Sequence, residues 1–220
     1  MKNTMTFDNL VIHEGNRDAV IAAKKILYTN EPEILYIYGK SGFGKTHILN
    51  AIYTELLNVG VEKICCITAE EFTNEMVNIL RKGVFSQFRE KYHNFNVLLI
   101  DAFQFASGKN AVLSEMQFII ETIIKNGGKI ILASDKNLDM LNIFEQLENR
   151  LYSGITVEIT QPDDDALINI ASSLSERFGA DIPTDTLAAL VKENKNPWRL
   201  SGAIKTLMMT MIQNEKNKYT

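Results

Sequence analysis

A short glycine-rich segment has the types and spacing of residues that bind phosphate. Residues 39–46 read GKSGFGKT and match the pattern G-x-x-x-x-G-K-[ST], with an apolar run before them and a helical pattern after them. Glycines let backbone N–H groups turn toward a phosphate, and the start of the following helix presents its positive dipole end to the same anion. An accidental glycine-rich turn is the alternative, but it leaves the flanking strand and helix unexplained. The pattern predicts a site for ATP or ADP with Mg²⁺, and its expected nucleotide contacts are Gly39, Gly42, Phe43, Gly44, Lys45, Thr46 and His47.

An aspartate ends the most apolar run of the chain, which reads VLLID at residues 97–101. An Mg²⁺-bound triphosphate needs a rigidly held carboxylate, and the end of a buried strand supplies one. We therefore expect Thr46 and Asp101 to serve the metal, and Lys45 and Asp101 to be the catalytic residues. A helix cap or a turn is the other role that Asp101 could have.

The residue after this aspartate bears on hydrolysis. Proteins of this type that hydrolyse ATP carry a second acid there, which orients the attacking water, but this chain has Ala102. Since losing a general base costs roughly 10²–10⁴-fold in rate, we expect binding without efficient hydrolysis. The alternative is that Glu70 or Glu71, in the neighbouring strand-to-helix turn, substitutes.

Strand and helix patterns alternate through the first part of the chain. This alternation favours a parallel sheet with right-handed crossovers. After Gln161-Pro162 the pattern is purely helical, and Asp163 fits the N-cap of the next helix. We therefore expect an α/β nucleotide-binding subdomain at residues 1–161 and a helical subdomain at residues 162–220. The expected strands are 34–38, 63–68, 97–101, 129–133 and 155–159, and the expected helices include 45–58, 70–81, 163–178, 184–193 and 198–214.

Composition describes an ordinary globular protein, with 45% apolar and 23% charged residues. No apolar run approaches the ~18 residues that span a bilayer, and the N-terminus lacks the apolar region of a secretory signal. We therefore expect a cytoplasmic protein with no membrane contact. The net charge of −4 lacks the basic surplus of a dedicated reader of double-stranded DNA. Cys65 and Cys66 would point to opposite faces of a strand, so we expect reduced core residues.

Several segments resemble one family: TFDNLV at 6–11, NR at 16–17, YGKSGFGKTHIL at 38–49, EFTNE at 71–75, FREKY at 88–92, LLID at 98–101, QF at 104–105, GK at 108–109 and ASD at 133–135. They are similar to the AAA+ domain of the bacterial replication initiator DnaA. The resemblance implies the P-loop AAA+ ATPase fold, an α/β architecture with a five-stranded parallel sheet and a small C-terminal helical lid. It also implies that Asn16 and Arg17 border the adenine and that Asp135 is a polar sensor after the fourth strand. Helix or turn capping remains open for Asn16 and Asp135.

The chain departs from the family pattern at several positions. It holds no counterpart of the family's DNA-reading helix-turn-helix domain or of its amino-terminal partner-binding domain. The segment LENRLYS at residues 147–153 runs straight into Gly154, so the arginine that reaches a neighbour's ATP is missing, and Arg150 matches an earlier arginine. The sensor 2 arginine aligns with Trp198, and Arg199, about 100° further around a helix, is the candidate to replace it. For Trp198 we expect a place in the lid core, with a stacking platform as the alternative.

The positions that bind single-stranded DNA in the family are only partly kept. Lys109 matches the Gly-Lys-x-Arg-Thr stretch, but the arginine and threonine are gone. A solvated helix face is the simpler interpretation of the remaining cations, and so few phosphate contacts would be weak and salt-sensitive. We therefore expect weak or no direct DNA binding. The remaining basic cluster consists of Arg81, Lys82, Arg89 and Lys91.

These features predict a DnaA-like ATP- or ADP-binding protein of DNA replication initiation or its regulation. We expect it to hydrolyse ATP poorly and to dock onto a DnaA-type initiator or another replication protein, as stand-alone, Hda-like relatives do. Self-association through AAA+ faces is also expected, and a subunit with one defective face would end a head-to-tail assembly. The alternative is an active ATPase that loads a helicase or initiates replication on a chromosome or mobile element, with weak single-stranded DNA contact. A third possibility is the isolated domain of a full initiator, against which Met1 and the departures weigh.

Overall fold

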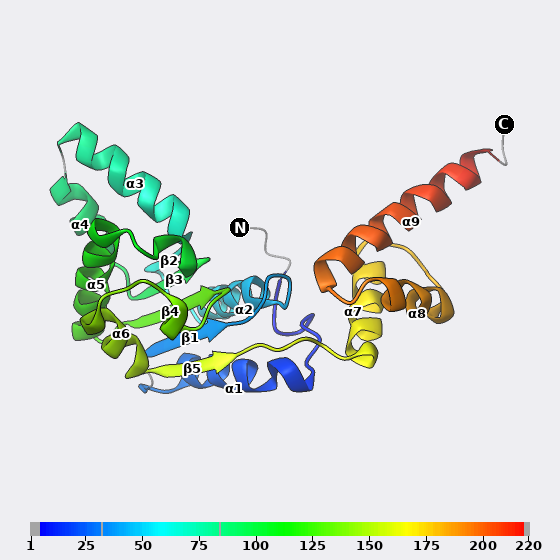
Figure 1. Ribbon diagram of the computed structural model, residues 1–220, viewed down its shortest axis with the longest axis horizontal. Coiled ribbons are helices and arrows are strands. Elements are labelled where there is room, and N and C mark those ends of the chain that lie inside the picture. The colour runs from blue at the N-terminus through cyan, green and yellow to red at the C-terminus, as the bar shows by residue number, and fades with distance from the viewer. Residues whose placement is uncertain (1–4, 32, 84, 218–220) are drawn as a thin grey trace. The chain divides into compact units, whose positions relative to one another are not determined.

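Two units make up the structure, a computed structural model that describes residues 5–31, 33–83 and 85–217 (Figure 1). The α/β unit comprises residues 1–10 and 17–159, and the helical unit comprises residues 11–16 and 160–220. The sequence predicts a nucleotide-binding subdomain that ends at residue 161 and a helical subdomain that begins at residue 162, and this functional division stays a prediction. Within the described residues, no helix has both the length and the apolar character needed to cross a membrane.

A five-stranded parallel sheet forms the centre of the α/β unit, in the order β2-β3-β4-β1-β5. The expected five-stranded parallel sheet is therefore confirmed. Its central strands are buried almost throughout, which is why they read as continuous apolar runs. The carboxyl ends of parallel strands meet at one edge, so the residues that follow β1, β3 and β4 gather there. The strands are β1 (Ile34–Tyr38), β2 (Ile64–Thr68), β3 (Val97–Asp101), β4 (Lys129–Ser134) and β5 (Ile155–Glu158).

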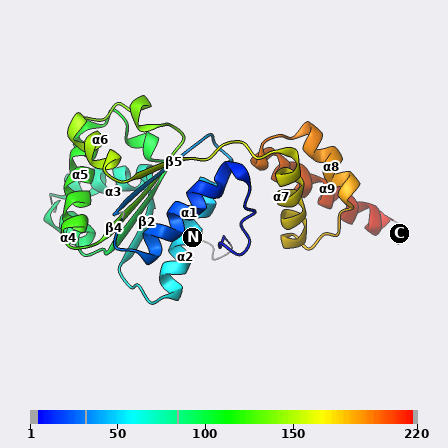
Figure 2. The same ribbon diagram turned by 90° about the horizontal axis from the view of Figure 1, so that it is seen from below.

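Helices cover both faces of this sheet (Figure 2). On one face lie α1 (Glu14–Tyr28) and α2 (Lys45–Asn58), packed on apolar side chains of β1, β3 and β4. The other face is covered by a larger set, which includes a core of aromatic rings from Phe72, Phe88 and Tyr92. That set consists of α3 (Ala69–Lys82), α4 (Phe85–His93), η1 (Phe103–Ala106), α5 (Asn110–Lys125), η2 (Leu138–Met140) and α6 (Glu145–Tyr152).

The two adjacent cysteines of β2 pack on opposite faces, as expected. Cys65 belongs to the core that contains α3 and α4, and Cys66 packs against the core that contains α1 and α2. Neither cysteine forms a disulfide bond. Burial raises the pKa of Cys65 to about 11 and that of Cys66 to about 12, so both thiols stay protonated and poorly reactive at neutral pH.

Three helices form the helical unit: α7 (Asp164–Arg177), α8 (Thr184–Glu193) and α9 (Pro197–Asn217). Asp163 is the N-cap of α7, because its side chain accepts a hydrogen bond of 2.8 Å from the backbone N–H of Ala166. The core of the unit is aliphatic and includes Leu167, Leu200 and Ile204. Trp198 is not part of it, since the side chain is 76% exposed in the first turn of α9. The expectation of a lid-core tryptophan was therefore wrong.

Candidate nucleotide-binding site

The phosphate loop connects the end of β1 to the start of α2. Gly39 has a φ of 151°, and a Cβ built on it would lie 2.2 Å from the backbone oxygen of Ile159. Only glycine fits that approach to the end of β5. Gly44, at the N-cap of α2, has a φ of 102°, a conformation that L side chains rarely adopt. The loop backbone therefore has the glycines that its shape requires, and it leads directly into the N-terminus of a helix.

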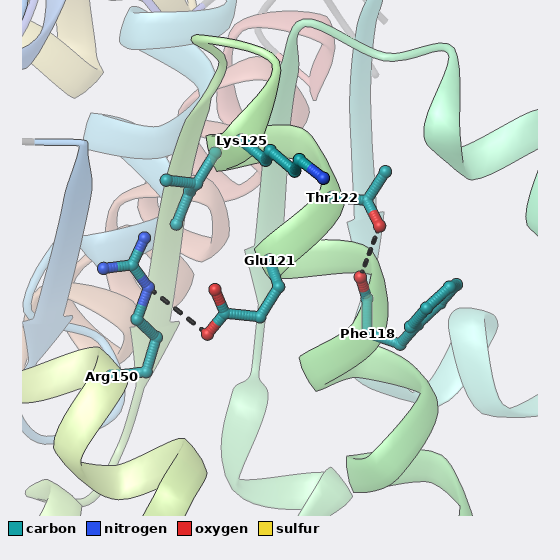
Figure 3. A pocket seen from close by; sticks show the side chains of 6 residues that line it. Phe118, Glu121, Thr122, Lys125 and Arg150 are labelled. Atoms are coloured by element: carbon teal, nitrogen blue, oxygen red, sulfur yellow. Dashed lines mark hydrogen bonds and ion pairs between the residues drawn. The ribbon is translucent and has the colours of Figure 1, made fainter.

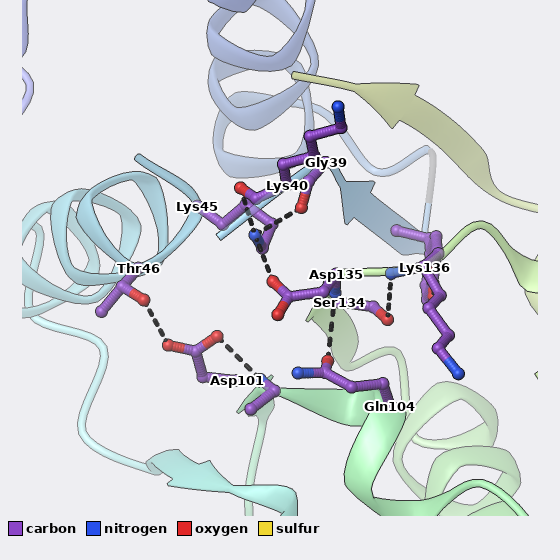
Figure 4. A network of polar contacts seen from close by, with 11 residues as sticks. Gly39, Lys40, Lys45, Thr46, Asp101, Gln104, Ser134, Asp135 and Lys136 are labelled. Atoms are coloured by element: carbon purple, nitrogen blue, oxygen red, sulfur yellow. Dashed lines mark hydrogen bonds and ion pairs between the residues drawn. The ribbon is translucent and has the colours of Figure 1, made fainter. Parts of the chain in front are cut away.

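Lys45 is the buried cation of the loop, with a side chain only 8% exposed. Its Nζ donates to the backbone oxygen of Gly39 at 2.6 Å and to that of Lys40 at 3.1 Å. The same ammonium lies 2.6 Å from Oδ1 of Asp135, the residue after β4 (Figure 4). A buried ammonium needs an anionic partner, and here the fold provides one from the neighbouring strand. The geometry fixes a positive charge inside the loop, where a phosphate would be bound.

Thr46 and Asp101 meet across the edge of the sheet, although 55 positions separate them in sequence. Thr46 Oγ1 donates to Asp101 Oδ2 at 2.6 Å, and the backbone N–H of Ala102 donates to Asp101 Oδ1 at 2.7 Å. Both carboxylate oxygens are therefore held. A hydroxyl and a fixed carboxylate are the oxygen donors that Mg²⁺ takes in phosphate sites, so these residues fit the ion that the sequence predicts.

Ala102 follows Asp101 in a left-handed conformation, with a φ of 55°. Among the described residues it alone combines a positive φ with a side chain. Its methyl group offers neither a proton acceptor nor a hydrogen-bond donor at the position of the second acid. The turn begins η1, which carries Gln104 toward the end of β4.

Glu71, one candidate for a substitute acid, is engaged at the N-terminus of α3. Its Oε2 accepts hydrogen bonds of 2.9 Å from both the backbone N–H and the hydroxyl of Thr68, and its own N–H donates to Thr68 Oγ1 at 3.1 Å. This reciprocal pair is a capping box. The hydrogen bonds from the Thr68 backbone and side chain lower the pKa of Glu71. A role as base would require the carboxylate to leave the cap.

The residues after β4 and the short helix η1 complete this edge of the sheet. Ser134 is fully buried, and its Oγ accepts from the backbone N–H of Lys136 at 3.1 Å. The backbone N–H of Asp135 donates to Oε1 of Gln104 at 3.1 Å. Sequence reasoning did not select Gln104 as a site residue. The signal that could have identified it is its place shortly after Asp101, between two phenylalanines.

Phe43 in the loop and His47 directly after it have other contacts in the α/β unit. A ring nitrogen of His47, Nε2, lies 2.9 Å from the backbone oxygen of Thr6. Phe43 is partly buried and packs against the core that contains α1 and α2. Their roles as nucleotide contacts, like that of Gly42, stay predictions.

Asn16 and Arg199 belong to the helical unit, so their contact with a nucleotide stays a prediction. Asn16 does not cap the first helix, because α1 begins earlier, at Glu14. Instead its Oδ1 accepts from the backbone N–H of His13 at 2.9 Å, while His13 Nδ1 accepts from the N–H of Gly15 at 3.1 Å. Burial lowers the pKa of His13, which favours the neutral ring that this acceptor role requires. The cap that was the alternative role for Asn16 is therefore made by His13.

The basic cluster on α3 and α4 is half neutralised by carboxylates. Arg89 makes two hydrogen bonds, of 2.9 and 2.8 Å, to Glu115, which is only 4% exposed. Lys91 lies 2.6 Å from Oε1 of Glu75. Arg81 and Lys82 remain exposed in the last turn of α3. Few charges on these helices are therefore available to a phosphate backbone.

A separate pocket of about 520 Å³ lies on α5 and α6 and includes no phosphate-loop residue (Figure 3). Arg150 lines it, with Nε 3.4 Å from Oε1 of Glu121 and Nη2 3.5 Å from Oε2 of Glu33. Both partners belong to the same chain. The other lining residues are Phe118, Thr122, Ile124 and Lys125.

The sheet order, with the phosphate loop after β1 and the paired aspartate at the end of β3, defines the class as a P-loop AAA+ fold. The family "Bacterial DnaA ATPAse domain" matches residues 1–158. The chain belongs to this family.

Individual relatives agree with that assignment. Chromosomal replication initiator protein DnaA of Lactiplantibacillus plantarum is 35% identical over 209 residues, which cover 90% of this chain and 45% of that protein. Domain III of the Thermotoga maritima replication initiation protein DnaA gives a TM-score of 0.93 at 29% identity, covering 98% of this chain and 92% of that one. A replication initiator DnaA bound to AMPPCP and single-stranded DNA gives 0.87 at 30% identity, covering 99% and 69%. The chain spans less than half the length of the curated relative.

Proposed function

We propose that the chain binds ATP or ADP with Mg²⁺ and acts in the initiation of DNA replication or in its regulation, in the cytoplasm. The observation that carries the proposal is the joint placement of Lys45, Thr46 and Asp101 at one edge of the sheet, with Thr46 Oγ1 2.6 Å from Asp101 Oδ2. Lys45 would neutralise phosphate charge, and Thr46 and Asp101 would hold the ion, which supplies further charge neutralisation when bound. The AMPPCP in a relative of 30% identity supports the nucleotide assignment.

The chain hydrolyses ATP poorly in this proposal. Ala102 provides no base beside Asp101, whose own oxygens accept from Thr46 and from the Ala102 backbone. Glu71 is held in the capping box of α3. Without a group to orient water, the site favours retention of the nucleotide over its turnover.

The bound nucleotide then serves assembly. We propose docking onto a DnaA-type initiator or another replication protein, and self-association through AAA+ faces. We propose that one of these faces is defective, because the segment between α6 and β5 does not contain the arginine that would reach a neighbour's ATP. Helix α6 ends at Tyr152 and β5 begins at Ile155, which leaves only Ser153 and Gly154 between them. Arg150 is engaged by Glu121 and Glu33 of its own chain. A subunit that lacks the arginine for a neighbour's ATP can still accept a neighbour at its other face, and it would end a head-to-tail assembly.

The test is single-turnover ATP hydrolysis measured beside a nucleotide-binding titration on the same purified sample. The expected result is saturable binding of ATP and ADP with hydrolysis no faster than in a Lys45→Ala control, which would also bind weakly. Clear turnover in the parent chain, absent from Lys45→Ala, would contradict poor hydrolysis. Failure of either nucleotide to bind would contradict the proposal as a whole.

A further inference from the structure

Gln104 has a side-chain amide whose orientation is fixed by one hydrogen bond. Its Oε1 accepts from the backbone N–H of Asp135 at 3.1 Å. Because a backbone N–H can only donate, the atom that faces it must be the amide oxygen, and the NH₂ group must face the other way. Figure 4 shows that nitrogen on the side of Asp101. The residue therefore presents two N–H donors to the edge of the sheet.

Two side-chain donors at the same edge of the sheet are already engaged. Lys45 Nζ contacts Gly39, Lys40 and Asp135, and the Thr46 hydroxyl donates to Asp101. By contrast, the NH₂ group of Gln104 has no hydrogen-bond partner recorded among the described residues. Gln104 is also only half-buried, so a ligand at this edge can reach it.

The backbone holds this donor beside the metal ligand. Gln104 lies in η1, which follows Asp101 directly through the left-handed turn at Ala102. Asp101 and Thr46 would hold an Mg²⁺ ion, which would neutralise charge on the terminal phosphates of a nucleotide at this edge. A donor fixed beside Asp101 is consequently suited to the terminal phosphate.

We propose that Gln104 recognises the terminal phosphate of the nucleotide. Its NH₂ group donates to γ-phosphate oxygens that ATP has and ADP lacks, and a hydrogen bond to an anion of this kind is strong. A carboxamide is not a general base, so this contact distinguishes the two nucleotides without supplying the base that the site lacks. The inference rests on the proposed nucleotide site. Through this contact, a chain that hydrolyses ATP slowly would still distinguish bound ATP from bound ADP.

A purely structural role, in which Gln104 only ties η1 to the end of β4, is the competing explanation. Gln104→Glu separates the two, because the carboxylate still accepts from the Asp135 N–H while the NH₂ donor becomes an anionic oxygen. Gln104→Leu removes the donor and the acceptor together. Gln87→Glu, at an exposed position on α4, adds the same charge away from the site.

The experiment is calorimetric titration of each variant with AMPPCP and with ADP, both in the presence of Mg²⁺. For Gln104→Glu we expect AMPPCP affinity to fall roughly tenfold or more while ADP affinity stays within about twofold. Gln104→Leu should lose a smaller factor for AMPPCP, and Gln87→Glu should match the parent chain. Retained ADP binding shows that the variants are folded.

Two results would overturn the inference. Equal losses for AMPPCP and ADP in Gln104→Glu would mean that the amide only shapes the edge of the sheet. An unchanged AMPPCP affinity would mean that the donor does not reach the phosphate. If the parent chain bound neither nucleotide, the proposed nucleotide site itself would fail, which is a different outcome from both.

Discussion

At the scale of single residues, Ala102 has a backbone conformation that asparagine and aspartate adopt more readily than alanine does. Its φ of 55° lies in the region where asparagine and aspartate are enriched and where most other side chains are rare. The preceding carboxylate is fixed by Thr46 and by the Ala102 N–H. At this position the difference from a hydrolytic site is thus one side chain, and the backbone needs no rearrangement to accept an acid.

Ala102→Asp should raise the single-turnover rate of ATP hydrolysis by about tenfold or more, because it supplies a group that can orient water. Ala102→Asn is the matched control, since it has nearly the same shape and tolerates the left-handed conformation but is a much weaker acceptor and no base. Equal rates in the two variants would argue that the missing acid is not what limits hydrolysis.

The places of Lys45, Thr46 and Asp101 in the fold could be predicted from sequence, but the contact of Gln104 could not. Local patterns put Lys45 and Thr46 at the start of a helix and Asp101 at the end of a strand. Gln104 acquires its partner only when β4 brings Asp135 alongside, 31 positions away in sequence. Similarly, the pairing of Arg89 with Glu115 joins two helices and cancels a charge that looked free in the sequence.

At the scale of elements, the strands follow their sequence patterns closely, while one helix start does not. β1 and β3 have the bounds that apolar runs predict, because strands buried on both faces tolerate few polar residues. The start of α1 could not be predicted, since histidine is not among the preferred N-cap residues. Its cap depends on a buried neutral ring and on Asn16 in the first turn.

The capping box of α3 predicts a pH-dependent contribution to stability. Glu71→Ala should lower the free energy of unfolding by about 0.5–1 kcal/mol at neutral pH, since the site is exposed and solvent-screened. The pKa of Glu71 is lowered in the folded chain, so its contribution is present above the ordinary value of 4.5 and disappears as pH falls through the lower folded-state pKa.

Urea unfolding at several pH values measures this, with Glu70→Ala in the same helix turn as the control. A loss from Glu71→Ala that persisted unchanged in acid would show that the ionised carboxylate is not the stabilising form. A simultaneous fall in any residual ATP hydrolysis would instead point to Glu71 as a substitute base.

The edge strand β5 contains a polar group that lowers stability. The Oγ1 atom of Thr156 is buried and has no hydrogen-bond partner in the part of the chain that the structure describes. Thr156→Val keeps the β-branched shape and removes that hydroxyl, so it should raise the free energy of unfolding by about 1 kcal/mol. Thr73→Val is the contrast, because the Thr73 hydroxyl donates to Ala69 at 2.6 Å and its loss should not stabilise. A destabilised Thr156→Val would imply that the hydroxyl has a partner after all.

At the scale of the whole molecule, we expect charge to limit any interaction with nucleic acid. The chain carries a net charge of −4, and Arg89 and Lys91 are paired within the fold. Affinity for DNA comes largely from phosphate contacts and falls steeply with salt. One relative of 30% identity has bound single-stranded DNA, whereas two of the four cations of the basic cluster in this chain face carboxylates of their own chain.

We therefore expect a dissociation constant for an oligothymidylate of about 10⁻⁵ M or weaker at physiological salt. Replacing Arg81 and Lys82 together by alanine should weaken binding further and reduce the salt slope by roughly one to two. Replacing Arg89 should mainly reduce stability, because it leaves the buried Glu115 carboxylate unpaired. Fluorescence anisotropy at two salt concentrations tests this, and tight, salt-independent binding would contradict it.

The exposed tryptophan of α9 has a consequence for how the molecule can be observed. Trp198 is the one tryptophan of the chain, and its side chain is 76% exposed. Tryptophan fluorescence therefore comes from the helical unit alone, and the α/β unit contributes none of it. A ring already surrounded by water changes its emission little on denaturation. It is readily quenched by dissolved iodide, and any ligand, neighbour or partner that covers it will shift its emission to shorter wavelength and protect it from the quencher. Tryptophan emission is therefore a poor measure of unfolding for this protein and a label-free measure of what binds to its lid.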